Sequence, residues 1–118
     1  MKILIVDDNQ GVRELIRSMV GELADAIQEC DDGSKALAAY EQFRPDWVLM
    51  DIGMKQLDGI SATGDIKERY PEARVLMVTD YGDLFFQEAA TEAGASGFVM
   101  KDKLFDIPRV ISELQGRS

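Results

Sequence analysis

Residues 3–10, ILIVDDNQ, place four apolar residues directly before two adjacent carboxylates, Asp7 and Asp8. Four consecutive aliphatic residues without polar alternation are typical of a strand that is covered on both faces. Two carboxylates about 4 Å apart repel each other by about 4 kcal/mol at a surface-like effective dielectric constant. The stretch therefore predicts a buried strand that ends in a cluster of negative charge, which a bound cation would stabilise.

Four more apolar runs follow, and stretches with helical spacing separate them. The expected strands cover residues 3–6, 26–30, 47–50, 75–78 and 97–100. Helical spacing is strongest in two sets of apolar residues, Val12, Leu15, Ile16, Met19 and Val20, and Leu104, Ile107, Val110, Ile111 and Leu114. Asn9 is expected to cap the first helix and Gly94 to end the fourth. Strands that alternate with helices predict an α/β fold with a parallel sheet, here a three-layer, doubly wound (βα)5 domain.

The composition indicates one globular domain over residues 1–118, with 46% apolar residues. The net charge of −9 argues against direct binding of nucleic acid. No apolar run approaches the ~20 residues of a membrane span or the core of a secretory signal, so we expect a cytoplasmic protein without membrane contacts. Cys30, the single cysteine, is expected to be a small buried residue, and the absence of histidine excludes catalysis by an imidazole.

Polar groups follow four of the five expected strands. In an open parallel sheet, ligands bind outside the carboxyl ends of the strands. The groups at these ends are Asp7 and Asp8, Asp51, Thr79 with Asp80, and Lys101. Oxygen ligands without histidine or cysteine favour a hard cation such as Mg²⁺. Each group alone has a simpler explanation, such as complementing a helix dipole, but their convergence favours a site; the simpler explanation stays open mainly for Asp80.

Four segments together resemble the receiver domain of bacterial two-component response regulators, in the CheY-like superfamily. They are ILIVDD, WVLMDIGMKQLDG, VLMVTD and AGASGFVMK, and they span nearly the whole chain. The resemblance implies a flavodoxin-like fold with strand order 2-1-3-4-5. It also implies a signalling switch that catalyses its own phosphorylation and dephosphorylation, with a histidine kinase or phosphotransfer protein as the phosphoryl donor.

The resemblance also implies a role for each site residue. Asp51 would be the phosphoacceptor and would form an acyl phosphate. Asp8, Asp51 and the backbone carbonyl of Gly53 would ligate Mg²⁺, and Asp7 would act through a bound water. Lys101 and the Thr79 hydroxyl would contact phosphoryl oxygens.

The resemblance further implies a switch and an output surface. Phe98 would turn inward when Thr79 is drawn to the phosphoryl group, although it could equally be an ordinary core aromatic. The output surface would comprise residues 81–93, strand 97–100 and residues 104–114, and would bind a second copy or an output domain. One of the consecutive residues Phe85 and Phe86 should be exposed there, because both cannot point into one core.

Two positions depart from the family pattern. Lys55 stands where these sequences usually have a proline, which removes a preset φ from the loop after the acceptor. Asp102 follows Lys101, a pairing that resembles receivers attached to LuxR-type helix-turn-helix output domains. The chain could therefore be a stand-alone receiver or the receiver part of a longer transcriptional regulator.

Two other functions remain open at the level of sequence. A Mg²⁺-dependent phosphatase with an aspartyl nucleophile would use a similar sheet, but that pattern separates its two acids by one residue, whereas Asp7 and Asp8 are adjacent. A flavin or nucleotide module would need a phosphate-binding loop after the first strand, where these anionic side chains repel phosphate.

Overall fold

The protein, described here by a computed structural model, is built on a parallel β-sheet. The structure describes residues 1–80, 82 and 84–116. Within these residues, five parallel strands lie in the order β2-β1-β3-β4-β5. Their bounds are β1 Lys2–Val6, β2 Ala26–Cys30, β3 Trp47–Met50, β4 Val75–Thr79 and β5 Gly97–Met100. Strand order and strand positions both confirm the predictions from the sequence.

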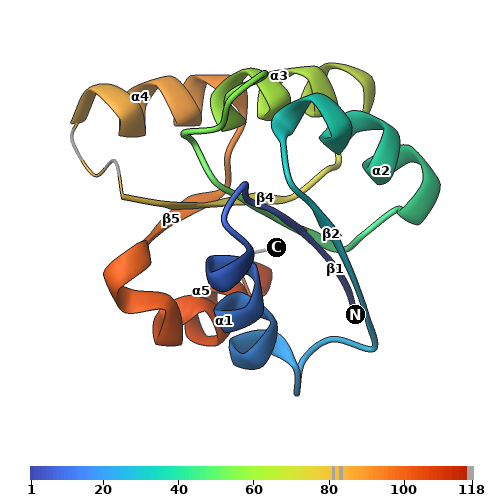
Figure 1. Ribbon diagram of the computed structural model, residues 1–118. Coiled ribbons are helices and arrows are strands. Elements are labelled where there is room, and N and C mark those ends of the chain that lie inside the picture. Colours follow the sequence, from blue (N-terminus) through green and yellow to red (C-terminus); the bar gives the residue numbers. More distant parts are fainter. Residues whose placement is uncertain (81, 83, 117–118) are drawn as a thin grey trace.

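Helices cover both faces of this sheet. The α-helices of the described part of the chain are α1 Gln10–Val20, α2 Ala36–Phe43, α3 Gly59–Arg69, α4 Leu84–Ala93 and α5 Ile107–Gln115, with short 3₁₀ helices η1 Gly33–Lys35 and η2 Lys101–Asp106. Figure 1 shows α2, α3 and α4 on one face and α1 and α5 on the other. The predicted three-layer, doubly wound arrangement is thus confirmed. None of the described helices is long and apolar enough to cross a membrane.

The central strands are buried on both faces, as their unbroken apolar runs predict. Alternate residues of a strand point to opposite faces of the sheet. In β1, Leu4 and Val6 join the core beneath α2, α3 and α4, whereas Ile3 and Ile5 join the core beneath α1 and α5. Cys30 is buried at the end of β2, as expected.

Two predictions about the helices are wrong, one about a buried face and one about where a helix begins. Leu15 was expected on the buried face of α1, yet it is 53% exposed, because the residues around Ile16 fill that face and leave Leu15 at its edge. The last helix begins at Ile107 and not near Leu104, because Pro108 fits only its first turn and Lys103 has non-helical dihedrals. Leu104 still packs into the core from η2.

The expected helix ends and the phenylalanine pair agree with the structure. The Asn9 side chain accepts a hydrogen bond from the Val12 amide and caps α1. Gly94 ends α4 with a φ of 107°, a backbone conformation that favours glycine. Phe85 is 72% exposed, whereas Phe86 packs against the core, which confirms that one of the two lies at the surface. Tyr81, at the start of the expected output surface, lies outside the described residues.

Candidate acidic site at the strand ends

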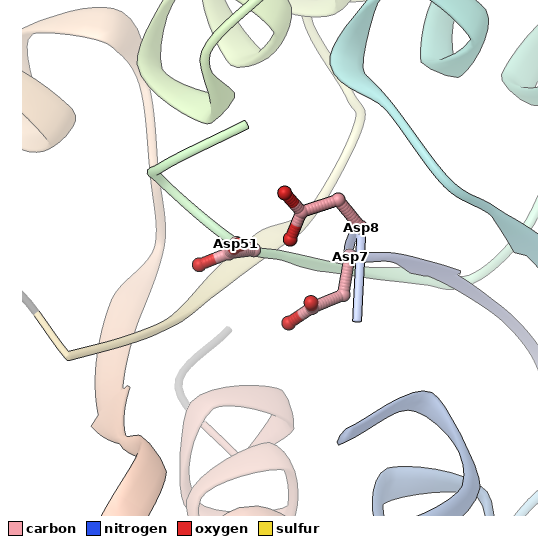
Figure 2. A group of neighbouring side chains, drawn as sticks. All are labelled: Asp7, Asp8 and Asp51. Carbon is pink, nitrogen blue, oxygen red and sulfur yellow. The ribbon is translucent and has the colours of Figure 1, made fainter. Parts of the chain in front are cut away.

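Three carboxylates meet where β1 and β3 end. Val6 and Met50 are paired in the sheet, so the residues that follow them leave the sheet side by side. Carboxylate oxygens of Asp7, Asp8 and Asp51 lie within 4.8 Å of one another. Figure 2 shows the three side chains together beyond the strand ends. Asp7 and Asp51 are buried and Asp8 is exposed, so the cluster is open to solvent on the Asp8 side.

Lys101 brings a positive charge into this cluster from the far edge of the sheet. Its ammonium nitrogen lies 3.1 Å from Asp7 Oδ2 and 3.2 Å from Asp51 Oδ1. The contact with Asp7 Oδ2 is an ion pair outside hydrogen-bond geometry, since that atom has no hydrogen-bond partner among the described residues. The Lys101 ammonium group therefore supplies part of the positive charge that the sequence led us to expect beside these carboxylates. One ammonium group does not balance three ionised carboxylates.

The buried position of Asp51 changes its acidity. Burial, and after it the negative charge of Asp7, raise the pKa of Asp51 to about 6, although Lys101 offsets part of both effects. Burial alone would lower the pKa of Lys101, but the neighbouring Asp51 and Asp7 carboxylates outweigh it and raise that pKa. Lys101 is thus held in its charged form, and Asp51 gains its negative charge only near neutral pH.

Hydrogen bonds from neighbouring elements fix the position of Asp7. The Asn9 amide donates a hydrogen bond of 2.8 Å to Asp7 Oδ1. The guanidinium group of Arg13 donates a hydrogen bond of 2.7 Å to the Asp7 carbonyl oxygen and also binds Glu29 on β2. Asp7 is therefore oriented by α1 and β2 as well as by its own strand.

The other predicted site residues lie on four different segments of the chain. Thr79 is fully buried as the last residue of β4 and pairs in the sheet with Met100, next to Lys101. Gly53 lies in the loop after β3 and lines a groove between α3 and the start of α4, together with Phe85. Phe98 is half-buried and packs into the core beneath α2, α3 and α4. Asp80 is exposed.

The donor set fits a hard divalent cation. It consists of carboxylate oxygens with no nitrogen or sulfur ligand, and it keeps excess negative charge after pairing with Lys101. The solvent-facing Asp8 leaves room for the water ligands that Mg²⁺ usually retains. The carboxylates of Asp7, Asp8 and Asp51 are the groups that could hold such an ion.

Sequence reasoning missed Asp32, a buried carboxylate close to the site. It accepts hydrogen bonds from the Ser34 amide at 2.8 Å and from the Gln56 and Leu57 amides at 3.0 and 3.2 Å. These bonds hold the pKa of Asp32 far below its ordinary range. An Asp-Gly pair after a strand signals a turn in the sequence, but its long-range partners become visible only in the fold.

Comparison with known proteins identifies the class of protein. The family model for the response regulator receiver domain matches residues 3–114. The chemotaxis protein CheY of Halobacterium salinarum is 35% identical over 113 residues, which cover 96% of this chain and 92% of that protein. The transcriptional regulatory protein DegU of Brevibacillus brevis is 30% identical, and the match covers 96% of this chain but 50% of DegU.

Solved structures agree with the sequence relatives. A two-component response regulator of the LuxR family from Aurantimonas sp. superposes with a TM-score of 0.89 at 32% identity, covering 98% of this chain and 86% of that chain. The chain belongs to the response regulator receiver domain family, which confirms the resemblance seen in the sequence. Its class is therefore the receiver domain of two-component signalling proteins.

Proposed function

We propose that residues 1–118 form one receiver domain that accepts a phosphoryl group on Asp51. The observation that carries this proposal is the position of Asp51, buried beside two further carboxylates and 3.2 Å from the Lys101 ammonium group. An Asp51 oxygen attacks phosphorus, the bond from phosphorus to the donor nitrogen breaks, and an acyl phosphate forms. The donor is a phosphohistidine of a histidine kinase or phosphotransfer protein.

In this proposal the ligands of a magnesium ion are Asp8, Asp51 and the backbone carbonyl of Gly53, with Asp7 acting through water. A bound Mg²⁺ supplies positive charge that offsets the repulsion between the phosphoryl oxygens and the attacking carboxylate. Asp7 also helps to hold Lys101 in place, because its Oδ2 lies 3.1 Å from the ammonium nitrogen.

Lys101 and Thr79 are proposed to stabilise the transferred group. The Lys101 ammonium group can follow the charge from the Asp51 carboxylate to a phosphoryl oxygen, because it already lies next to the acceptor. The Thr79 hydroxyl would donate a hydrogen bond to another phosphoryl oxygen. Both groups stand at strand ends, which fix their positions better than a loop would.

The same contacts would operate the switch. Phosphorylation adds a group with about two negative charges, and recruitment of Thr79 to it would shift the connection between β4 and α4. Phe98, half-buried on β5, would then pack further inward. We propose that the surface formed by α4, β5 and α5 transmits this change to a second copy or to an output domain.

The wider context is also a proposal. The chain spans about half the length of DegU, a transcriptional regulatory protein, but nearly all of CheY. We infer that it serves either as a separate signalling domain or as the receiver of a longer regulator, working in the cytoplasm. The acceptor chemistry is the same in both cases.

The direct test is the intact mass of the protein after incubation with acetyl phosphate, with Mg²⁺ or with a chelator. The parent should gain one phosphoryl group with Mg²⁺ and much less without it, and Asp51→Asn should gain none. A parent that gains no phosphoryl group while a known receiver does so under the same conditions would overturn the proposal.

A further inference from the structure

The loop between β3 and α3, residues 51–58, holds both the acceptor and Gly53. Its far end is anchored, because the Gly59 amide donates a hydrogen bond of 2.8 Å to the Ile52 carbonyl oxygen. Asp58 caps α3 by accepting a hydrogen bond from the Ser61 amide. Gly53, whose backbone carbonyl is a ligand of the ion in the proposed function, lies between these anchors.

Asp32 holds the middle of this loop from a different element. Its two carboxylate oxygens accept hydrogen bonds from the Gln56 and Leu57 amides, and one of them also binds the Ser34 amide at the start of η1. Asp32 is only 7% exposed, so these bonds are shielded from water and are charge-assisted. The connection between β2 and α2 is thereby tied to the acceptor loop.

Close packing strengthens this tie. A Cβ atom added to Gly33 would lie 2.3 Å from the Leu57 carbonyl oxygen, so the two backbones approach too closely for any other residue. The Ser34 hydroxyl donates a hydrogen bond of 3.3 Å to the Gln56 side chain. Lys55 does not fix its own φ as a proline would, so the loop depends on external contacts for its shape.

We infer that Asp32 is a positioning residue for the cation site: by fixing the Gln56 and Leu57 amides, it holds the acceptor loop so that the Gly53 carbonyl faces Asp8 and Asp51. Asp32 itself does not touch the ion or the phosphoryl group. The inference rests on the proposed function for the identity of the ion.

The test measures binding of Mg²⁺ alone to the metal-free protein by calorimetric titration. Asp32→Asn should raise the Kd for Mg²⁺ by about tenfold, as expected when a group that orients a ligand is lost. Asp32→Ser keeps a hydrogen-bond acceptor for the Ser34 amide but cannot reach the loop, so it should weaken Mg²⁺ binding similarly while disturbing the fold less. Both variants should also lose hydrogen-exchange protection at the Gln56 and Leu57 amides.

The matched control is Asp31→Asn. Asp31 is adjacent, exposed and paired with Lys35, and it lines the same polar cleft as Asp8, so this variant removes the same charge without loosening the loop. Its Kd for Mg²⁺ should change by less than about twofold. Equal weakening in Asp31→Asn and Asp32→Asn would show a simple charge effect and would overturn the inference.

A second readout separates positioning from general stability. With acetyl phosphate as donor, saturating Mg²⁺ should restore most of the phosphorylation rate of Asp32→Asn, because only ion affinity is impaired. An unchanged Kd together with a lower Tm would make Asp32 merely structural and would overturn the inference. If the parent binds Mg²⁺ but is not phosphorylated, the proposed function fails while the role of Asp32 is still decided by the titration.

Discussion

At the scale of single residues, the site is defined by an imbalance of charge. Asp7 and Asp51 share one ammonium group, that of Lys101, and Asp8 adds a third carboxylate at the solvent edge. Removing Asp51 or Lys101 changes this balance in opposite directions. The two substitutions therefore have opposite expected effects on stability in the absence of metal.

Asp51→Asn should stabilise the metal-free protein near neutral pH. The folded pKa of about 6 lies above the ordinary value of 3.8, so ionisation of Asp51 costs folding free energy as the pH rises through this interval. The neutral variant avoids that cost, and its gain should grow from pH 4 to about pH 6 and then level off at no more than about 3 kcal/mol. Urea unfolding in chelator at several pH values measures this difference.

A matched control for this experiment is Asp102→Asn, which neutralises an exposed carboxylate outside the cluster. Its stability should stay within about 0.5 kcal/mol of the parent at every pH. If Asp51→Asn is less stable than the parent at pH 8 in chelator, the proposed repulsion within the cluster is wrong.

Lys101→Met should slow phosphorylation by about 100-fold at saturating Mg²⁺, since it removes a cation placed where charge develops during transfer. It should also destabilise the metal-free protein, because two buried carboxylates lose their shared partner. Lys103→Met serves as the control, since Lys103 is exposed in the same 3₁₀ helix. Equal rates for the two variants, measured by intact mass against time with acetyl phosphate, would contradict the role of Lys101.

At the scale of elements, the contact between α3 and the acceptor backbone is the tightest constraint near the site. A Cβ atom on Gly59 would lie 1.8 Å from the Asp51 carbonyl oxygen, whereas one on Gly64 would meet no atom within 4 Å. Gly59→Ala should therefore cost more than about 2 kcal/mol, and Gly64→Ala should gain about 0.5–1 kcal/mol from helix propensity. Urea unfolding of both variants provides the check, and a neutral Gly59→Ala would contradict this packing.

The strands could be predicted from the sequence because their apolar runs are long enough to be buried on both faces. The position of the site followed from the strands, since a parallel sheet brings the residues after β1, β3, β4 and β5 together at the carboxyl ends of its strands. Asp7, Asp8, Asp51 and Lys101 do meet there. Periodicity alone could not show that Leu15 lies at the edge of its helix face or that Asp32 binds a loop 24 residues away.

At the scale of the whole molecule, phosphorylation is expected to alter what the surface formed by α4, β5 and α5 binds. Exposed Leu84 and Phe85 at the start of α4 adjoin the segment that Thr79 would move. Beryllofluoride with Mg²⁺, which imitates a phosphoryl group, should tighten self-association by about 5- to 150-fold, the usual range of such coupling. Sedimentation velocity of the parent with and without beryllofluoride measures this, and Asp51→Asn should not respond. Identical sedimentation of the parent in both conditions would contradict a self-associating output.

We propose that Asp51, and neither of its neighbouring carboxylates, carries the phosphoryl group. Borohydride reduction of the phosphorylated protein converts an acyl phosphate to an alcohol, so peptide mass analysis then reveals the modified position. Homoserine is expected at position 51 alone, and only when phosphodonor and Mg²⁺ are both supplied. Homoserine at position 7 or 8, or at no aspartate of a protein that has gained the phosphoryl mass, would contradict it.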